Sequence, residues 1–228
     1  MKTIMAIGAH TGDAQLTGGL LLSRCALEGW RIVTLDLTAG ERGCPRGMTQ
    51  AEFRQMNVSA AAEFANALGG ESIVLDIPDG ELNYSQELAV RIADIMREYS
   101  ADTVLYHWKN SMHKDHIAAN RLTTDAIFFA SLPTFERSLP PAPIRHWYYA
   151  ENWEDSEGFV PYAYFDVSSG FNAWKDAVRK LYLTEHSRDF KYLQYYEALA
   201  RMRGALIKTE YAVAFGVDNY AKRIKPEL

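Results

Sequence analysis

The chain has 228 residues, of which 48% are hydrophobic and 23% charged, a composition typical of one globular domain with a substantial core. A formal net charge of −5 gives no general attraction to a phosphate backbone, so nucleic acid is not an expected partner. No apolar run approaches the roughly 18 to 20 residues that cross a bilayer, so no membrane span is expected.

The first apolar run, residues 3–9, leads directly into the candidate site residues described below. We therefore expect it to be a buried strand and not a signal peptide. Cys25 and Cys44 form neither a disulfide framework nor a CxxC metal site. Free thiols are expected, and with them a cytoplasmic protein.

Short apolar runs alternate with longer amphipathic stretches, the pattern of βαβ units. Strands are expected over residues 3–9, 31–37, 72–77, 103–107, 146–151 and 163–167. Helices are expected over 16–29, 49–68, 86–99, 116–130 and most of 172–208, with a proline-rich connection over 132–143. Right-handed crossovers then predict a Rossmann-like three-layer α/β/α fold, with a mainly parallel sheet and a single domain over residues 1–228.

Polar clusters follow the strands at the edge where open α/β sheets bind ligands. His10 and Asp13 follow the first strand in AHTGDAQ, and His116 follows the fourth in MHKDH. Two histidines and one carboxylate suit zinc or another first-row divalent metal, with positions left for water. Each histidine alone is more often structural, but two clusters meeting at one edge favour a metal or catalytic site.

Two further groups belong to this edge. His113, one turn before His116, is expected to donate a proton or hydrogen bond near the metal, with Asp115 holding an imidazole in one tautomer. Glu41, in the LTAGERG loop after the second strand, is either a site residue or a solvated charge, at about even odds.

The order AHxxDA, LTxGExG, PDG and HxDH, continuing through YFDVSSGFNAWKDAV and the helix bearing His186 to TEYAVAF, resembles the PIG-L/LmbE-like N-acetyl-sugar deacetylases. The resemblance covers nearly the whole chain. It implies zinc-dependent hydrolysis of the amide bond of an N-acylated amino sugar, in a protein whose relatives often form homo-oligomers.

The resemblance also implies a role for each matching residue. Zinc would be held by His10, Asp13 and His116. His113 would stabilise the oxyanion or protonate the leaving amine, with Asp115 as its orienting partner. Arg54 and Asp79 would contact the substrate.

The chain departs from the family pattern at Thr11, Gly12, Gln15 and Asn57. Gly12 replaces the aspartate that serves as general base, and loss of a general base costs about 10²- to 10⁴-fold in rate. Three interpretations stay open. Glu41, or less readily Asp115, could supply the base; a metal-acidified water could suffice for an activated substrate; or the protein could bind metal and a sugar-like ligand without turnover.

Overall fold

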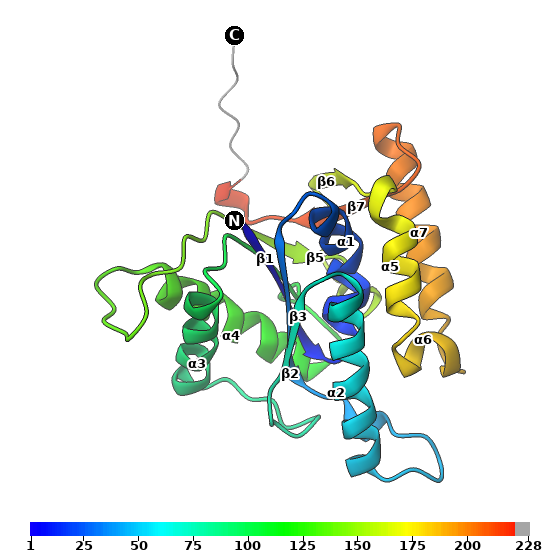
Figure 1. The fold of residues 1–228 in the computed structure, drawn as a ribbon, viewed down its shortest axis with the longest axis horizontal. Helices are drawn as coiled ribbons and strands as arrows, with labels where there is room; N and C mark the ends of the chain where they lie inside the picture. The colour runs from blue at the N-terminus through cyan, green and yellow to red at the C-terminus, as the bar shows by residue number, and fades with distance from the viewer. Residues whose placement is uncertain (222–228) are drawn as a thin grey trace.

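The computed structural model describes residues 1–221. Within these residues, one seven-stranded sheet runs in the order β3-β2-β1-β4-β5-β7-β6 (Figure 1). The strands are β1 (Thr3–His10), β2 (Arg31–Thr38), β3 (Glu71–Val74), β4 (Thr103–Tyr106), β5 (His146–Ala150), β6 (Ala163–Asp166) and β7 (Ala212–Gly216). The helices are α1 (Gly19–Leu27), α2 (Gln50–Ala67), α3 (Gln86–Glu98), α4 (Lys114–Ser131), α5 (Phe171–Val178), α6 (Tyr182–His186) and α7 (Tyr192–Ile207).

The sheet is mostly parallel. The five strands from β3 to β5 pair in parallel, whereas β7 pairs antiparallel with both β5 and β6. Helices α3 and α4 cover one face, and α1, α2, α5 and α7 cover the other (Figure 1). The predicted three-layer α/β/α fold with a mainly parallel sheet is therefore confirmed.

Strand β1 divides its side chains between two cores because successive residues of a strand point to opposite faces. Ile4 and Ala6 join the cluster under α1, α5 and α7, whereas Met5 and Ile7 join the cluster under α3 and α4. Burial on both faces explains why this strand reads as a continuous apolar run. It also fixes the carboxyl end of β1 in the middle of the sheet.

The first helical segment begins with a π-helical turn, Ala14–Gly18, before α1 continues as a regular helix. The glycines at this junction permit close packing. A β-carbon at Gly19 would lie 2.7 Å from the ring of Trp174 in α5, and the Trp174 indole N–H donates to the Gln15 carbonyl at 3.0 Å. The turn that carries Asp13 is thereby held against α5.

Two sequence predictions of strands need correction. Strand β3 ends at Val74 and not at residue 77, since only the Leu75 N–H continues the pairing, with the Asp36 carbonyl at 2.9 Å. Strand β7 was not predicted. It lies within the TEYAVAF segment, and its partners β5 and β6 come from much earlier in the chain, so local periodicity did not identify it.

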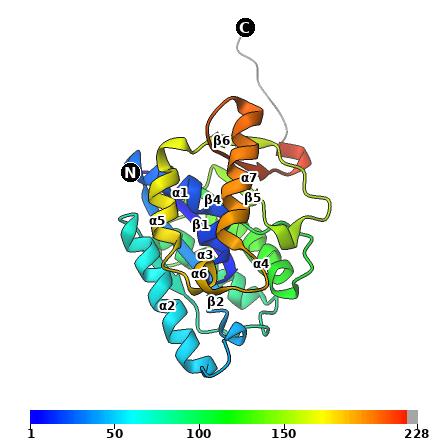
Figure 2. The same ribbon diagram turned by 90° about the vertical axis from the view of Figure 1, so that its right-hand side faces the viewer.

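The C-terminal region is mostly helical, as expected, with α5, α6 and α7 stacked beside the sheet (Figure 2). Cys25 and Cys44 are both free thiols. Among residues 1–221, none of the helices combines the length and apolar character needed to cross a membrane.

The proline-rich connection after α4 is anchored by one buried arginine, Arg97 of α3, whose residue is 3% exposed. Its guanidinium donates to the carbonyls of Ala130, Leu139, Phe129, Leu132 and Phe135 at 2.8 to 3.1 Å. Backbone carbonyls thus compensate the buried charge.

Candidate active site

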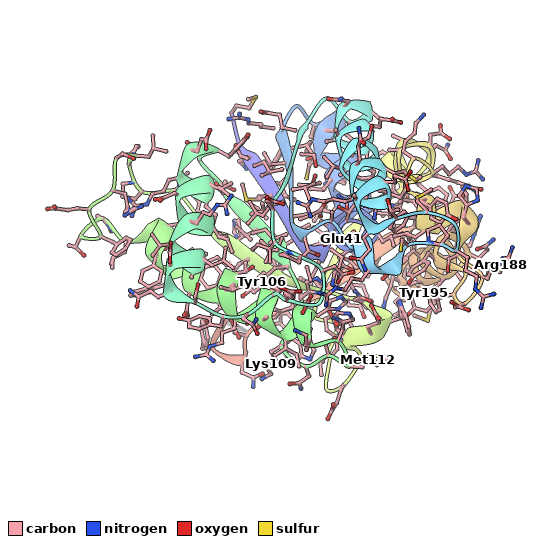
Figure 3. The ribbon with its side chains drawn as sticks, turned by 90° about the horizontal axis from the view of Figure 1, so that it is seen from below. Glu41, Tyr106, Lys109, Met112, Arg188 and Tyr195 are labelled. Atoms are coloured by element: carbon pink, nitrogen blue, oxygen red, sulfur yellow. The ribbon has the colours of Figure 1, made fainter. Side chains whose placement is uncertain are left out.

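A cleft of about 1050 Å³ opens at the carboxyl ends of β1, β2 and β4, where the sequence placed its candidate residues. Its wall includes His10, Asp13, Asp79, His113, His116 and Glu154. Figure 3 looks at this end of the molecule, with Glu41 near the middle of the view and Arg188, which lines the cleft, at its edge. Helix α6 and the segment after it, up to Tyr192, form the far side.

His10 and Asp13 are brought together by a tight turn after β1. The Asp13 Oδ2 atom accepts the His10 backbone N–H at 2.8 Å and lies 3.2 Å from His10 Nδ1. A β-carbon at Gly8 would lie 2.8 Å from the Asp13 β-carbon, and Gly12 has φ +119°. Glycines at these two positions therefore allow the carboxylate to fold back onto the strand end.

The first turn of α4 brings the second cluster to the same place. Asp13 Oδ2 lies 3.4 Å from His116 Nε2, and the His10 and His116 ring centres are 5.3 Å apart. The His113 ring centre is 4.6 Å from that of His10 and 4.9 Å from that of His116. Residues separated by about a hundred positions in sequence thus share one cleft.

The His10 imidazole is surrounded by carboxylates. Its Nε2 atom lies 3.2 Å from Asp79 Oδ1 and 3.4 Å from Asp115 Oδ2. Burial alone would lower the pKa of His10, but Asp115, Asp13 and Asp79 together raise it to about 12. Burial would likewise raise the pKa of Asp13, but the neighbouring imidazoles of His116 and His107 hold it well below its usual range.

The donor set fits a divalent metal. Ligand atoms of Asp13, His107 and His116 lie within 4.8 Å of one another, and so do those of His10, His113 and His116. The predicted ligands His10, Asp13 and His116 are thus divided between two overlapping groups that share His116. Imidazole nitrogens with carboxylate oxygens suit zinc and other first-row ions.

His107 and Asp155 are site residues that the sequence reasoning missed. His107 Nε2 accepts the Ala9 backbone N–H at 3.0 Å, and His107 Nδ1 lies 2.8 Å from Asp155 Oδ2. The other Asp155 oxygen lies 2.8 Å from His116 Nδ1. His107 was predicted only as the last residue of a strand. Applying the strand-end rule to the fifth strand, which leads into Asn152 and Asp155, could have found Asp155.

Glu41 and Arg54 lie behind the residues of the cleft wall and do not line the cleft. Glu41 is 6% exposed, its Oε1 accepts the Asp79 backbone N–H at 2.9 Å, and its Oε2 lies 3.5 Å from Arg54 Nη1. Arg54 also donates to the Leu75 carbonyl at 3.0 Å and pairs with Asp76 at 2.9 Å. Of the two predicted substrate contacts, Asp79 therefore lines the cleft and Arg54 supports it.

Asp115 reaches His113 through its backbone and not through its carboxylate. The Asp115 N–H donates to His113 Nδ1 at 3.2 Å, whereas the carboxylate accepts the Gly80 N–H at 2.8 Å and faces His10. Burial would raise the pKa of Asp115, but its contacts with His10 and Gly80 lower it to about 2. Asp115 therefore contacts His113 as expected, but through its backbone N–H and not through its carboxylate.

Glu154 is a second carboxylate in the cleft that the sequence reasoning missed. Its Oε2 lies 3.7 Å from His116 Nε2, the nitrogen that also faces Asp13. Burial raises the pKa of Glu154 above its usual range. The residue belongs to a short 3-10 turn, Trp153–Asp155, and its own N–H donates to the Asn152 side chain. No sequence motif marks this turn.

A leucine and a glutamine occupy the surroundings of Gly12, where the family pattern has an acidic residue. A β-carbon at Gly12 would lie 2.5 Å from Leu183 Cδ2 of α6. Below the turn, Gln15 accepts the Gly12 N–H and donates to Asp36, both at 2.8 Å. Gln15 and Asp36 are both fully buried.

Residues 5–127, more than half of the chain, match the family described as PIG-L, GlcNAc-PI de-N-acetylase. The chain is 24% identical to the 4-oxalmesaconate hydratase of Pseudomonas putida KT2440 over 221 residues, 93% of this chain and 83% of that protein. It is 30% identical to the diacetylchitobiose deacetylase of Thermococcus kodakarensis over 143 residues, 60% of this chain and 54% of that protein.

Among solved structures, the fold is similar to that of the 4-carboxy-2-hydroxymuconate hydratase from Pseudomonas putida KT2440. The TM-score is 0.87 at 22% identity, and the likeness covers 100% of both chains.

Proposed function

The chain belongs to the PIG-L, GlcNAc-PI de-N-acetylase family, and on that premise we propose that it is a zinc-dependent hydrolase of amide carbon–nitrogen bonds in N-acylated amino sugars. The observation that carries the proposal is the position of Asp13 Oδ2, 3.2 Å from His10 Nδ1 and 3.4 Å from His116 Nε2. Separations near 3.3 Å are those expected between neighbouring ligand atoms around a tetrahedral metal with bonds of about 2.0 to 2.2 Å.

His10, Asp13 and His116 would hold the metal. When bound, it would polarise the substrate carbonyl and acidify water. Each imidazole is backed by carboxylates on its far side: His10 by Asp79 and Asp115, and His116 by Asp155. Such outer partners orient the ring and raise its basicity toward a metal.

His113 is suited to donate a hydrogen bond to the developing oxyanion or a proton to the leaving amine. Burial and the neighbouring His10 and His116 lower the pKa of His113, so a neutral ring is favoured near pH 7. Its Nδ1 accepts the Asp115 N–H, which leaves the ring proton on Nε2. That proton is the one available to the cleft.

Attack on the amide carbonyl requires a group that accepts a proton from the water. Glu41 is one proposed residue for this step. It lies behind Asp79, so it would act indirectly, by holding Asp79 and Arg54 in place. Glu154 is the stronger candidate for direct transfer because it lines the cleft and lies 3.7 Å from His116 Nε2.

The substrate would be small and polar. Asp79 would contact it directly, with Arg54 acting through Glu41. Trp153 lines the cleft and stacks on Phe190 at 4.4 Å between ring centres, so this face could pack against a sugar ring. The free thiols of Cys25 and Cys44 accord with the proposed cytoplasmic location.

A second candidate function is hydration of a carbon–carbon double bond in a carboxylated substrate. It is favoured by the leucine that fills the space beside Gly12, and by a hydratase relative that aligns over 93% of this chain. Retention of metal and ligand binding without turnover is the third alternative, and it too follows from the absent carboxylate at position 12.

One set of assays separates these functions. Zinc-loaded protein is assayed with N,N′-diacetylchitobiose for released acetate and, separately, with 4-oxalmesaconate for loss of its ultraviolet absorbance. Acetate release abolished in His116→Ala supports the hydrolase, and turnover of 4-oxalmesaconate alone supports the hydratase. His116→Ala should also lose its zinc, and retention of full stoichiometry would refute the ligand assignment.

A further inference from the structure

One buried carboxylate, Asp155, joins two histidines of the cleft. Its oxygens each lie 2.8 Å from an imidazole Nδ1, one from His107 and the other from His116. Asp155 is fully buried, and its own N–H donates to the Asn152 carbonyl at 3.0 Å within the turn after β5. The carboxylate is therefore fixed by the fold and has no competing contact with solvent.

The tautomer of His107 follows from a backbone contact. The Ala9 N–H at the end of β1 donates to His107 Nε2 at 3.0 Å, so that nitrogen carries a lone pair. The ring proton must then be on Nδ1, where it is donated to Asp155. Because this lone pair is already used, His107 is a poor metal ligand, although its ring centre lies only 4.1 Å from that of His116.

The tautomer of His116 follows from its contact with Asp155. The other Asp155 oxygen already accepts the His107 proton, and a carboxylate offers only acceptor atoms, so the oxygen that faces His116 must accept as well. His116 must therefore donate from Nδ1. Its Nε2 lone pair is left facing Asp13 Oδ2, 3.4 Å away.

We propose that Asp155 is a positioning residue of the metal centre: it fixes His116 as the tautomer whose Nε2 can bind the ion, and it fixes His107 in a structural role that ties β4 to the end of β1. The inference rests on the metal dependence proposed above. It excludes His107 from the ligands, although His107 is close enough to Asp13 and His116 to be one.

Replacing the Asp155 carboxylate by an amide should reveal its effect on the tautomer of His116. In Asp155→Asn, the side chain has one acceptor oxygen and one NH₂ donor, so only one imidazole can still donate from Nδ1. The Ala9 N–H holds His107 in its tautomer. His116 is then the ring that changes, and the proton moves to the nitrogen needed for the metal.

The first experiment measures zinc affinity by chelator competition and the visible d–d absorption of the cobalt-substituted protein. Asp155→Asn should bind zinc about 10- to 100-fold more weakly and show an altered cobalt spectrum. The matched control is Asp102→Asn, another buried aspartate, 6% exposed, which precedes β4 at the opposite end of that strand. It should leave both readouts unchanged. His107→Gln should retain full zinc stoichiometry.

The second experiment reads the tautomers without a change at Asp155. Long-range ¹H–¹⁵N correlation spectra of the zinc-loaded protein, labelled at histidine and assigned with His107→Gln, should show His107 and His116 protonated at Nδ1. An Nε2-protonated His116 would overturn the proposal even where Asp155→Asn does not fold.

The outcomes separate this inference from the proposed function. Zinc affinity unchanged in Asp155→Asn, with wild-type zinc binding that depends on His116, would overturn the role of Asp155 alone. Zinc loss in His107→Gln equal to that in His116→Ala would make His107 a ligand and overturn its structural assignment. A wild-type protein that binds no zinc would remove the metal centre and this inference together.

Discussion

Leu183 occupies the space into which a side chain at position 12 would extend: its Cδ2 lies 2.5 Å from where the β-carbon of a substituted Gly12 would be. The absence of a carboxylate at this position is therefore accompanied by an apolar side chain from α6, about 170 residues later in the chain. A side chain at position 12 would therefore clash with Leu183 unless that leucine were changed as well.

Gly12→Asp alone should not raise deacetylase activity. The φ of +119° disfavours any side chain and should cost on the order of 1 to 3 kcal/mol, and the carboxylate would meet Leu183. We expect a lower unfolding free energy in urea and no gain in acetate release from N,N′-diacetylchitobiose.

The double variant Gly12→Asp with Leu183→Ala relieves the clash, and it should raise acetate release toward the 10²- to 10⁴-fold effect of a general base. Leu183→Ala alone is the control and should leave acetate release unchanged. If Gly12→Asp alone raised acetate release as much as the double variant, Leu183 would move freely and its position beside Gly12 would not affect activity.

The fold was largely predictable because most of its strands are local apolar runs between amphipathic helices. The first strand illustrates this, since burial on both faces produces an unbroken hydrophobic segment. The antiparallel strand β7 was not predictable in the same way. Its pairing with β5 and β6 is decided by tertiary contacts that a sequence window does not contain.

The candidate site was predictable where its residues follow strands, as His10, Asp13 and His116 do. Glu154 and Asp155 were not predicted because they lie on a short turn that no sequence motif marks. The contact of Asp155 with His107 also joins residues 48 positions apart in the chain. That Leu183 fills the space beside Gly12 could be recognised only in the folded structure. Nothing in the local sequence of α6 connects Leu183 to the first turn.

Glu154→Gln tests the proposed proton acceptor. If Glu154 accepts the proton from the attacking water, the amide should lower kcat by about 10²- to 10⁴-fold while leaving zinc content unchanged. The matched comparison is Glu41→Gln, in which the amide oxygen can still accept the Asp79 N–H. We expect a much smaller loss there. The reverse ranking of the two variants would assign the base to Glu41.

Asp36 should make stability depend on pH. Burial raises its pKa from 3.8 to about 8, so the folded protein keeps a proton that the unfolded chain releases above about pH 4. This contribution is fully present below pH 4 and is lost as the pH rises toward 8, at up to about 1.4 kcal/mol per pH unit. Asp36→Asn keeps an acceptor for Gln15.

The Asp36→Asn variant should therefore gain stability relative to the wild type as the pH rises from 4 to 8. Urea unfolding at several pH values measures the difference, and subtracting the wild type removes the contributions of other groups. A difference that does not vary with pH would show that Asp36 is ionised throughout.

Arg97 should be the most sensitive residue of the connection after α4. Arg97→Met fits the apolar surroundings but leaves five buried or partly buried carbonyls without their donor, so we expect a loss of about 3 to 5 kcal/mol in unfolding free energy. Arg97→Lys should recover little of this lost stability, since an ammonium cannot reach carbonyls in all the directions that a planar guanidinium serves.

The control is Arg137→Met, which removes an exposed ion pair with Asp94 from the same region and should cost at most about 1 kcal/mol. Equal losses in the two methionine variants would mean that the segment is held by its apolar contacts and not by the guanidinium.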